Sequence, residues 1–161
     1  MTLSLFPTNL ATAPWSTLWR IARDGDPVVI DLHSRHYSAR TYADGRPRRL
    51  IVGPGEKLVL VARDDRALFV WRRMAYTLDG QRGICCAVFR REAGALASDL
   101  IREADALADD RWPGVRHYTY VAPSRVASTN PGYCFLRAGW RRCGLTKGGH
   151  GRPRLIILER C

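Results

Sequence analysis

From residue 57 onward, short apolar runs separated by turn residues predict most of a β-sheet. KLVLVAR (57–63) and ALFVWRR (67–73) flank an Asp-Asp turn and predict a β-hairpin. ICCAVFRRE (84–92) is mostly apolar, as is typical of a central strand. VRHYTYVAP (115–123) alternates between apolar and polar residues, and RLIILER (154–160) predicts a final strand.

Helical spacing replaces this pattern elsewhere. Over 98–110 we expect an amphipathic helix with Ser98 as its N-cap. Its apolar stripe consists of Leu100, Ile101, Ala104, Leu107 and Ala108. Asp26-Pro27 predicts the N-cap and first residue of another helix, which continues to His36-Tyr37. A short helix is expected over 15–21, inside an N-terminal extension (1–26) whose structure the pattern leaves open.

The segment NPGYCFLRAGW (130–140) has the punctuation of a turn, a short helix and a second turn. The predicted order is therefore helix, hairpin, strand, helix, strand, short helix, strand. The strand–helix–strand unit at 84–122 predicts a parallel pair with a right-handed crossover. Together these elements predict a single α/β domain, 1–161, with a mixed central sheet and flanking helices.

The net charge favours a polyanionic partner. The chain has 26 Lys+Arg against 15 Asp+Glu, a net charge of +11, and most of the cations are arginine. A GC-rich genome would explain arginine in place of lysine, but not the excess of cations. Because guanidinium binds phosphate in a bidentate manner, the excess favours DNA or RNA.

The basic, Gly-rich loop 141–154 is the candidate for phosphate contact, with a solvated surface turn as the alternative. Its proposed DNA-contacting residues are Arg141, Arg142, Lys147 and Arg152.

The cysteines and the N-terminus indicate a cytoplasmic protein. The five cysteines contain no CxxC pair, so neither a disulfide framework nor a zinc knuckle is expected. Small buried thiols are favoured over a metal held by Cys134, Cys143 and His150. The first residues contain no basic leader and Pro7 breaks their apolar stretch, so we expect no signal peptide. No apolar run has the length of a membrane span.

The order of elements resembles the GNAT acyltransferases over about residues 27–160. In that family a loop after the long central strand holds the pyrophosphate of an acyl-CoA donor, and a later short helix ends in Gly plus an aromatic residue. Gly139-Trp140 matches that ending, and REAGAL (91–96) matches the loop at Arg91 and Gly94. The resemblance implies a donor site, in which a helix N-terminus faces a diphosphate. Its residues would be Arg90, Arg91, Gly94 and Ser98.

Two positions depart from the family pattern. Leu96 stands where the family has Gly or Ala, and its side chain would crowd a pyrophosphate. Phe135 stands where many members place the tyrosine that protonates the leaving thiolate, and Tyr133 lies two residues earlier. These two departures from the family pattern predict weak acetyl-CoA binding and a reaction other than the standard acetyl transfer.

Within this superfamily the chain is more similar to the Mom-type DNA-modification proteins of bacteriophages. The similarity is carried by His36-Tyr37, by Arg90 or Arg91, by Ser98 and by the region of Asn130 and Tyr133. That family adds a carbamoylmethyl group to adenine N6 and so protects phage DNA from restriction. The resemblance implies a catalytic set of His36, Tyr37, Ser124, Asn130 and Tyr133.

In this assignment His36 accepts a proton, since it is the nearby group expected to titrate near neutral pH, and Tyr37 stacks on or bonds the base. The family pattern suggests an acidic residue near Ser124 or Asn130, so the general base stays open. A paired base must leave the helix stack to react. The aromatic residues expected to hold it are Tyr37, Tyr42, Tyr133 and Trp140.

Three functions follow from these residues. The first is a DNA-modifying transferase of the host cytoplasm that acts on adenine N6. Its donor would be acetyl-CoA or a glycine-derived molecule such as glycyl-tRNA, because the product contains a glycinamide unit. The second is an ordinary N-acetyltransferase that uses acetyl-CoA on a small amine or a protein. The third is a non-catalytic, basic nucleic-acid-binding module.

Overall fold

The structure, a computed structural model, describes residues 16–36, 39, 43–45, 49–125 and 130–161, and these form one seven-stranded mixed sheet. The strands are β1 (Trp19–Ala22), β2 (Glu56–Ala62), β3 (Ala67–Arg73), β4 (Ile84–Arg91), β5 (His117–Val121), β6 (Arg141–Leu145) and β7 (Ile156–Arg160). Their order across the sheet is β1-β2-β3-β4-β5-β7-β6. β4 and β5 are parallel, and the other neighbouring pairs are antiparallel. The α/β class and the mixed sheet are confirmed.

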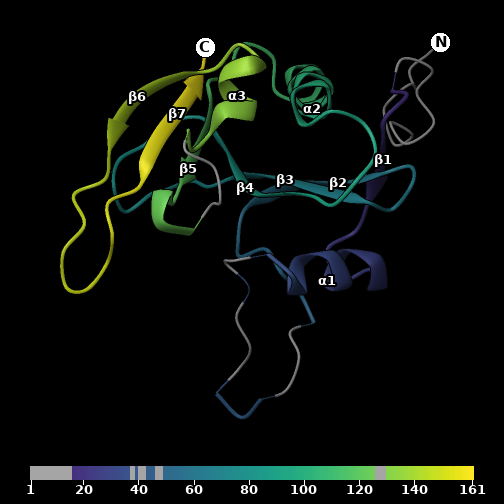
Figure 1. Ribbon diagram of the computed structural model, residues 1–161, viewed down its shortest axis with the longest axis horizontal. Coiled ribbons are helices and arrows are strands. Elements are labelled where there is room, and N and C mark those ends of the chain that lie inside the picture. Colours follow the sequence, from purple (N-terminus) through teal and green to yellow (C-terminus); the bar gives the residue numbers. More distant parts are fainter. Residues whose placement is uncertain (1–15, 37–38, 40–42, 46–48, 126–129) are drawn as a thin grey trace.

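Helices cover both faces of this sheet. The helix α1 (Pro27–Ser34) lies on one face, and α2 (Ala97–Arg111) and α3 (Tyr133–Arg137) lie on the other (Figure 1). A 3-10 turn, Pro123–Arg125, follows β5. None of the helices among the described residues is both long and apolar enough to cross a membrane.

The two-sided cover explains why β2 and β3 are continuous apolar runs. Leu58 and Leu60 pack into the core under α2, whereas Val59 and Val61 pack into the core under α1. Strands buried on both faces lose the usual alternation of apolar and polar residues. The hairpin predicted at 57–63 and 67–73 is confirmed as β2 and β3.

The parallel pair is short, and its geometry opens the sheet. Ile84, Cys85 and Cys86 of β4 pair with the first residues of β5, and beyond Cys86 the two strands no longer pair. On its other edge β4 carries a β-bulge, because Cys86 pairs with Trp71 and Val88 pairs with Val70, which leaves Ala87 as the extra residue. A bulge bends its strand. The pairing of β4 with β5 ends at Cys86, the residue before this bulge, and the predicted parallel pair with helix α2 between the strands is confirmed.

The helix predicted over 15–21 is wrong, because residues 19–22 form the edge strand β1. Trp19 is fully buried, pairs with Ala62 of β2, and donates its indole N–H to the Leu100 carbonyl at 2.8 Å. The tertiary pairing outweighs a short run of helical spacing. Residues 16–26 therefore belong to the domain rather than to an extension.

Two helix boundaries also differ from the prediction. The helix α1 begins at Pro27 with Asp26 as its N-cap, as expected, but ends at Ser34, so His36 lies beyond it. The N-cap of α2 is Leu96, and Ser98 is already the second residue of the helix. Neither N-cap makes a side-chain capping bond.

The basic segment predicted as a loop over 141–154 is also partly wrong. Residues 141–145 form strand β6, which pairs with β7 at the sheet edge. All five residues of β6 are exposed. An edge strand without a buried face leaves no hydrophobic pattern in the sequence, and its pairing partner alone defines it.

Gly139-Trp140 ends α3 by placing Trp140 in a buried polar network. Gly139 takes a left-handed φ of 97°, and Trp140 is 3% exposed with its ring against those of Phe135 and Trp71. The indole N–H of Trp140 donates to Asp105 Oδ2 at 2.8 Å. Asp105 Oδ1 lies 2.7 Å from His117 Nδ1, so α2, β5 and the end of α3 share one buried carboxylate. The segment thus fixes α3 to the core.

Candidate active site

The separation of β4 from β5 creates a slot through the sheet with a volume of about 140 Å³. The hydroxyl of Thr119 donates to the Cys86 carbonyl at 2.8 Å and so bridges the two strands where they part. The lining of the slot consists of His36, residues 86–89 of β4, residues 119–121 of β5, and Gly132, Cys134 and Phe135. The slot therefore runs from the end of α1 on one face to α3 on the other.

His36 is the predicted catalytic residue that the structure brings to the slot. Burial, together with the charges of His33 and Arg90, lowers the pKa of its imidazole to about 4, although a bond to the Phe89 backbone acts in the opposite direction. The rings of His33 and His36 stack with centroids 6.2 Å apart. At neutral pH the imidazole is uncharged. This differs from the expected group titrating near neutral pH, because a half-buried ring beside a guanidinium resists protonation.

On the opposite face, α3 forms the wall of the slot. Gly132 precedes the helix with a φ of 82°, and a Cβ there would lie 2.6 Å from Leu158 Cδ1, so the position requires glycine. The Cys134 thiol lines the slot, and burial raises its pKa above the ordinary value. Phe135 packs against Trp140 and Phe89. This wall is apolar and offers no acid.

The other predicted catalytic residues lie away from the slot lining. Ser124 is exposed in the 3-10 turn after β5. Asn130 accepts a hydrogen bond from Arg142 Nη2 at 2.6 Å, and Tyr133 is 52% exposed on α3. Tyr37, like Tyr42 of the proposed base-holding group, lies outside the described residues.

The proposed donor residues at the end of β4 are engaged within the protein. Arg90 donates to Glu92 Oε2 at 2.8 Å and to the Arg35 carbonyl at 2.6 Å. Arg35 forms a bidentate pair with the same Glu92, and these hydrogen bonds lower the pKa of the Glu92 carboxyl to about 2. The arrangement joins the C-terminal end of α1 to β4 and positions His36.

The loop before α2 is closed by its own arginine. Arg91 donates to the carbonyls of Ala95 at 2.7 Å and Gly94 at 3.0 Å. Gly94 has a φ of 90°, and a Cβ there would lie 2.4 Å from Asp64 Oδ2. Leu96 is 65% exposed at the N-terminus of α2. A carboxylate beside this loop opposes the binding of a diphosphate.

The predicted phosphate-contacting residues lie on the β6–β7 hairpin. Arg141 pairs with Glu159 at 2.5 Å and Arg142 bonds to Asn130, so part of their charge is engaged inside the molecule. Lys147 and Arg152 are exposed in the connection between the strands. Since Ile156 pairs with Val121 at the end of β5, this connection lies at the same end of the sheet as the slot.

Sequence reasoning did not identify Ala87, Thr119 or Cys134 as site residues. Thr119 and Cys134 are single residues within predicted elements and carry no motif. Ala87 matters because it is the extra residue in the pairing of β4 with β3. Two consecutive cysteines before a small residue do not predict a bulge. Among the described residues, no three His, Cys, Asp or Glu side chains gather as metal ligands.

The geometry combines a neutral imidazole, a bridging hydroxyl and an apolar wall in one slot, whose lining comes from elements on both faces of the sheet. Such a slot suits the transfer of a small group between two molecules that approach from opposite faces, with the imidazole as proton acceptor. Comparison of the sequence with family models and with curated proteins finds no match.

Proposed function

We propose that this chain is a DNA-modifying transferase of the cytoplasm that adds a small group to adenine N6, on a scaffold of GNAT type. The observation that carries the proposal is the slot between β4 and β5, with His36 at one face and α3 at the other. In a GNAT scaffold two neighbouring central strands part, and the slot lies where β4 and β5 part here. The strand order and the bulge at Ala87 support that resemblance.

The slot holds the reacting ends of the two substrates rather than either substrate in full. A volume of about 140 Å³ equals that of roughly five water molecules at ~30 Å³ each. The edge of a base and a small transferred group fit this space. The rest of the adenine lies outside, on the face of α1, and the base must leave the duplex to reach it.

In the proposed step, the N6 nitrogen forms a bond to the donor carbon while the donor loses its leaving group. The nitrogen then bears a proton that it must release, and it is most acidic at this stage. The uncharged His36 imidazole accepts this proton. An imidazole with a pKa of about 4 remains ready to accept a proton throughout the neutral range.

DNA is held by the connection between β6 and β7, where Lys147 and Arg152 are exposed at the slot end of the sheet. Contacts of this kind fix the position of a duplex without reading its sequence. The donor is proposed to differ from acetyl-CoA. Asp64 stands beside the loop that would hold the pyrophosphate, and Arg91 is engaged by that loop's own carbonyls. A glycine-derived donor such as glycyl-tRNA carries no pyrophosphate to place there.

The test is the content of modified deoxyadenosine in plasmid DNA from cells that express the protein, measured by mass spectrometry of the digested nucleosides. We expect a modified deoxyadenosine with the wild-type chain and its loss with His36→Ala. Ser34→Ala is the matched control, because Ser34 is exposed and bonds only locally to Asp31. The proposal is refuted if DNA stays unmodified although the wild-type protein is folded in the host of origin. It is also refuted if His36→Ala modifies the DNA fully.

Lys147→Gln with Arg152→Gln tests the DNA contact separately. The double variant should bind duplex DNA more weakly and flatten the slope of log affinity against log salt by about 0.9 for each lost contact. Arg66→Gln, at the exposed turn between β2 and β3, is the charge control, because β4 and β5 separate that hairpin from the β6–β7 hairpin in the strand order. Equal salt slopes for the wild type and the double variant would remove these residues from the interface.

A further inference from the structure

The loop between β3 and β4 forms a second cavity of about 420 Å³. Because β3 ends and β4 begins here, this cavity lies at the end of β4 opposite to the slot. Its lining comprises residues 73–77, residues 80–83 and Val115. It is therefore distinct from the candidate active site.

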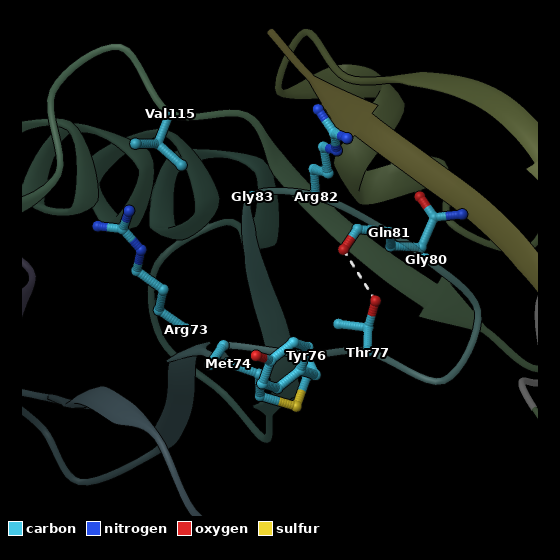
Figure 2. A pocket seen from close by; sticks show the side chains of 10 residues that line it. Arg73, Met74, Tyr76, Thr77, Gly80, Gln81, Arg82, Gly83 and Val115 are labelled. Atoms are coloured by element: carbon cyan, nitrogen blue, oxygen red, sulfur yellow. Dashed lines mark hydrogen bonds between the residues drawn. The ribbon is translucent and has the colours of Figure 1, made fainter.

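The lining combines two cations with an exposed aromatic ring. Arg73 and Arg82 supply the cations, and no carboxylate occurs among the ten residues that line the cavity. Tyr76 is 91% exposed, although a tyrosine ring usually buries much of its surface. Figure 2 shows Arg73, Tyr76 and Arg82 on different sides of the opening, with Val115 across from Tyr76.

Two carboxylates near the loop lie outside the lining, where they accept hydrogen bonds from neutral groups and keep their negative charge. Asp79 accepts a hydrogen bond from the Tyr120 hydroxyl. Glu56 accepts the indole N–H of Trp112 at 3.0 Å. Within the lining itself, two guanidinium groups without a carboxylate favour an anion.

The loop is held in shape in its middle and where it joins β4. Thr77 Oγ1 donates to the Gln81 carbonyl at 2.9 Å, a bond drawn in Figure 2, and Arg116 donates to the Arg82 carbonyl at 2.8 Å. A Cβ at Gly83 would lie 2.1 Å from the Arg116 carbonyl oxygen, so the loop joins β4 through a close approach that only glycine allows. The cavity is thus formed before any ligand arrives.

We propose that this cavity binds a nucleotide unit, with the base stacked on Tyr76 and the phosphate between Arg73 and Arg82. A flat π-face beside bidentate phosphate donors is the combination that binds single nucleotides and single strands. The unit comes either from a free nucleotide or from a nucleic-acid strand. This assignment stands on the cavity alone and does not rest on the transferase activity of the slot.

The first arm of the test is calorimetry with ADP, and the second is fluorescence anisotropy with a labelled single-stranded oligonucleotide of about ten nucleotides. The second arm uses the Lys147→Gln, Arg152→Gln background, so that the hairpin does not mask the cavity. Tyr76→Ala should weaken binding about tenfold, and Tyr76→Phe should bind like the wild type, because stacking needs the ring and not the hydroxyl. Arg82→Gln should weaken binding and flatten its salt dependence.

Leu78→Ala is the matched control, because Leu78 is fully exposed on the same loop but does not line the cavity. Binding of ADP with this pattern of variants identifies a free nucleotide as the source, and binding of the oligonucleotide alone identifies a strand. If Tyr76→Ala and Leu78→Ala bind both probes alike, or if Arg66→Gln weakens binding as much as Arg82→Gln, the proposal is overturned. Thermal midpoints of all variants should match, since the changed side chains are exposed.

Discussion

Replacing Asp105 tests whether the buried network around Trp140 holds α3, and with it the wall of the slot. Asp105 is 2% exposed and accepts from Trp140 Nε1 at 2.8 Å while its other oxygen lies 2.7 Å from His117 Nδ1. Asp105→Ala leaves both nitrogens buried without this acceptor. Removing one partner from a buried charged pair of this kind lowers the free energy of unfolding by about 3–5 kcal/mol.

The assay is urea unfolding followed by tryptophan fluorescence, with a thermal melt beside it. At 2–4 °C per kcal/mol for a domain of this size, the thermal midpoint should fall by roughly 6–20 °C. Asp105→Asn keeps one acceptor of similar volume and should lose less. Asp110→Ala removes the same charge from an exposed position of α2 and should change stability by less than about 0.5 kcal/mol.

The reasoning is refuted if Asp105→Ala unfolds within about 1 kcal/mol of the wild type, which is the span of an ordinary surface change. It is also refuted if Asp105→Asn loses as much stability as Asp105→Ala, because the loss would then follow the charge and not the buried acceptor.

Three further outcomes are expected. Gly132→Ala should destabilise by about 1–3 kcal/mol in a thermal melt, because its Cβ would lie 2.6 Å from Leu158 Cδ1, whereas Gly139→Ala, with a similar φ but open space, should lose less. His36 should titrate near pH 4 by NMR; since the unfolded chain binds this proton near pH 6.5, stability should fall as pH drops from about 6.5 to 4, and His36→Gln should reduce that fall. Acetyl-CoA should show no low-micromolar binding by calorimetry, and Leu96→Gly should gain affinity if that side chain crowds the loop.

The elements that the sequence predicts well are those with a buried face. Strands β2 to β5 and helix α2 were predicted because packing on one or both sides imposes a period on their residues. The failures have the opposite character. β6 has no buried side chain, and β1 is four residues long and defined by its partner β2. Long-range pairing decides such segments, and a local pattern cannot report it.

The same distinction holds for the candidate site. His36 lines the slot because it follows a helix whose position the core determines, and its catalytic role stays a prediction. Ser124, Asn130 and Tyr133 lie outside the slot lining, since the direction of a side chain in a turn or short helix depends on contacts the sequence does not state. Tyr76 lies in the segment between two predicted strands, where the sequence has no hydrophobic period. Its exposure beside two arginines is visible only in the structure.

The slot between β4 and β5 lies beside a bulge that consists of one extra residue, Ala87. Cys86 faces α2 and Val88 faces α1, so these two residues would alternate correctly even as direct neighbours. Deleting Ala87 would leave the other side chains of β4 on the faces they already occupy and remove only the bend. A change of one residue in β4 can therefore alter the slot and leave the packing of the scaffold as it is. We therefore expect that deletion of Ala87 extends the pairing of β4 with β5 and closes the slot, while the core residues of β4 keep their faces.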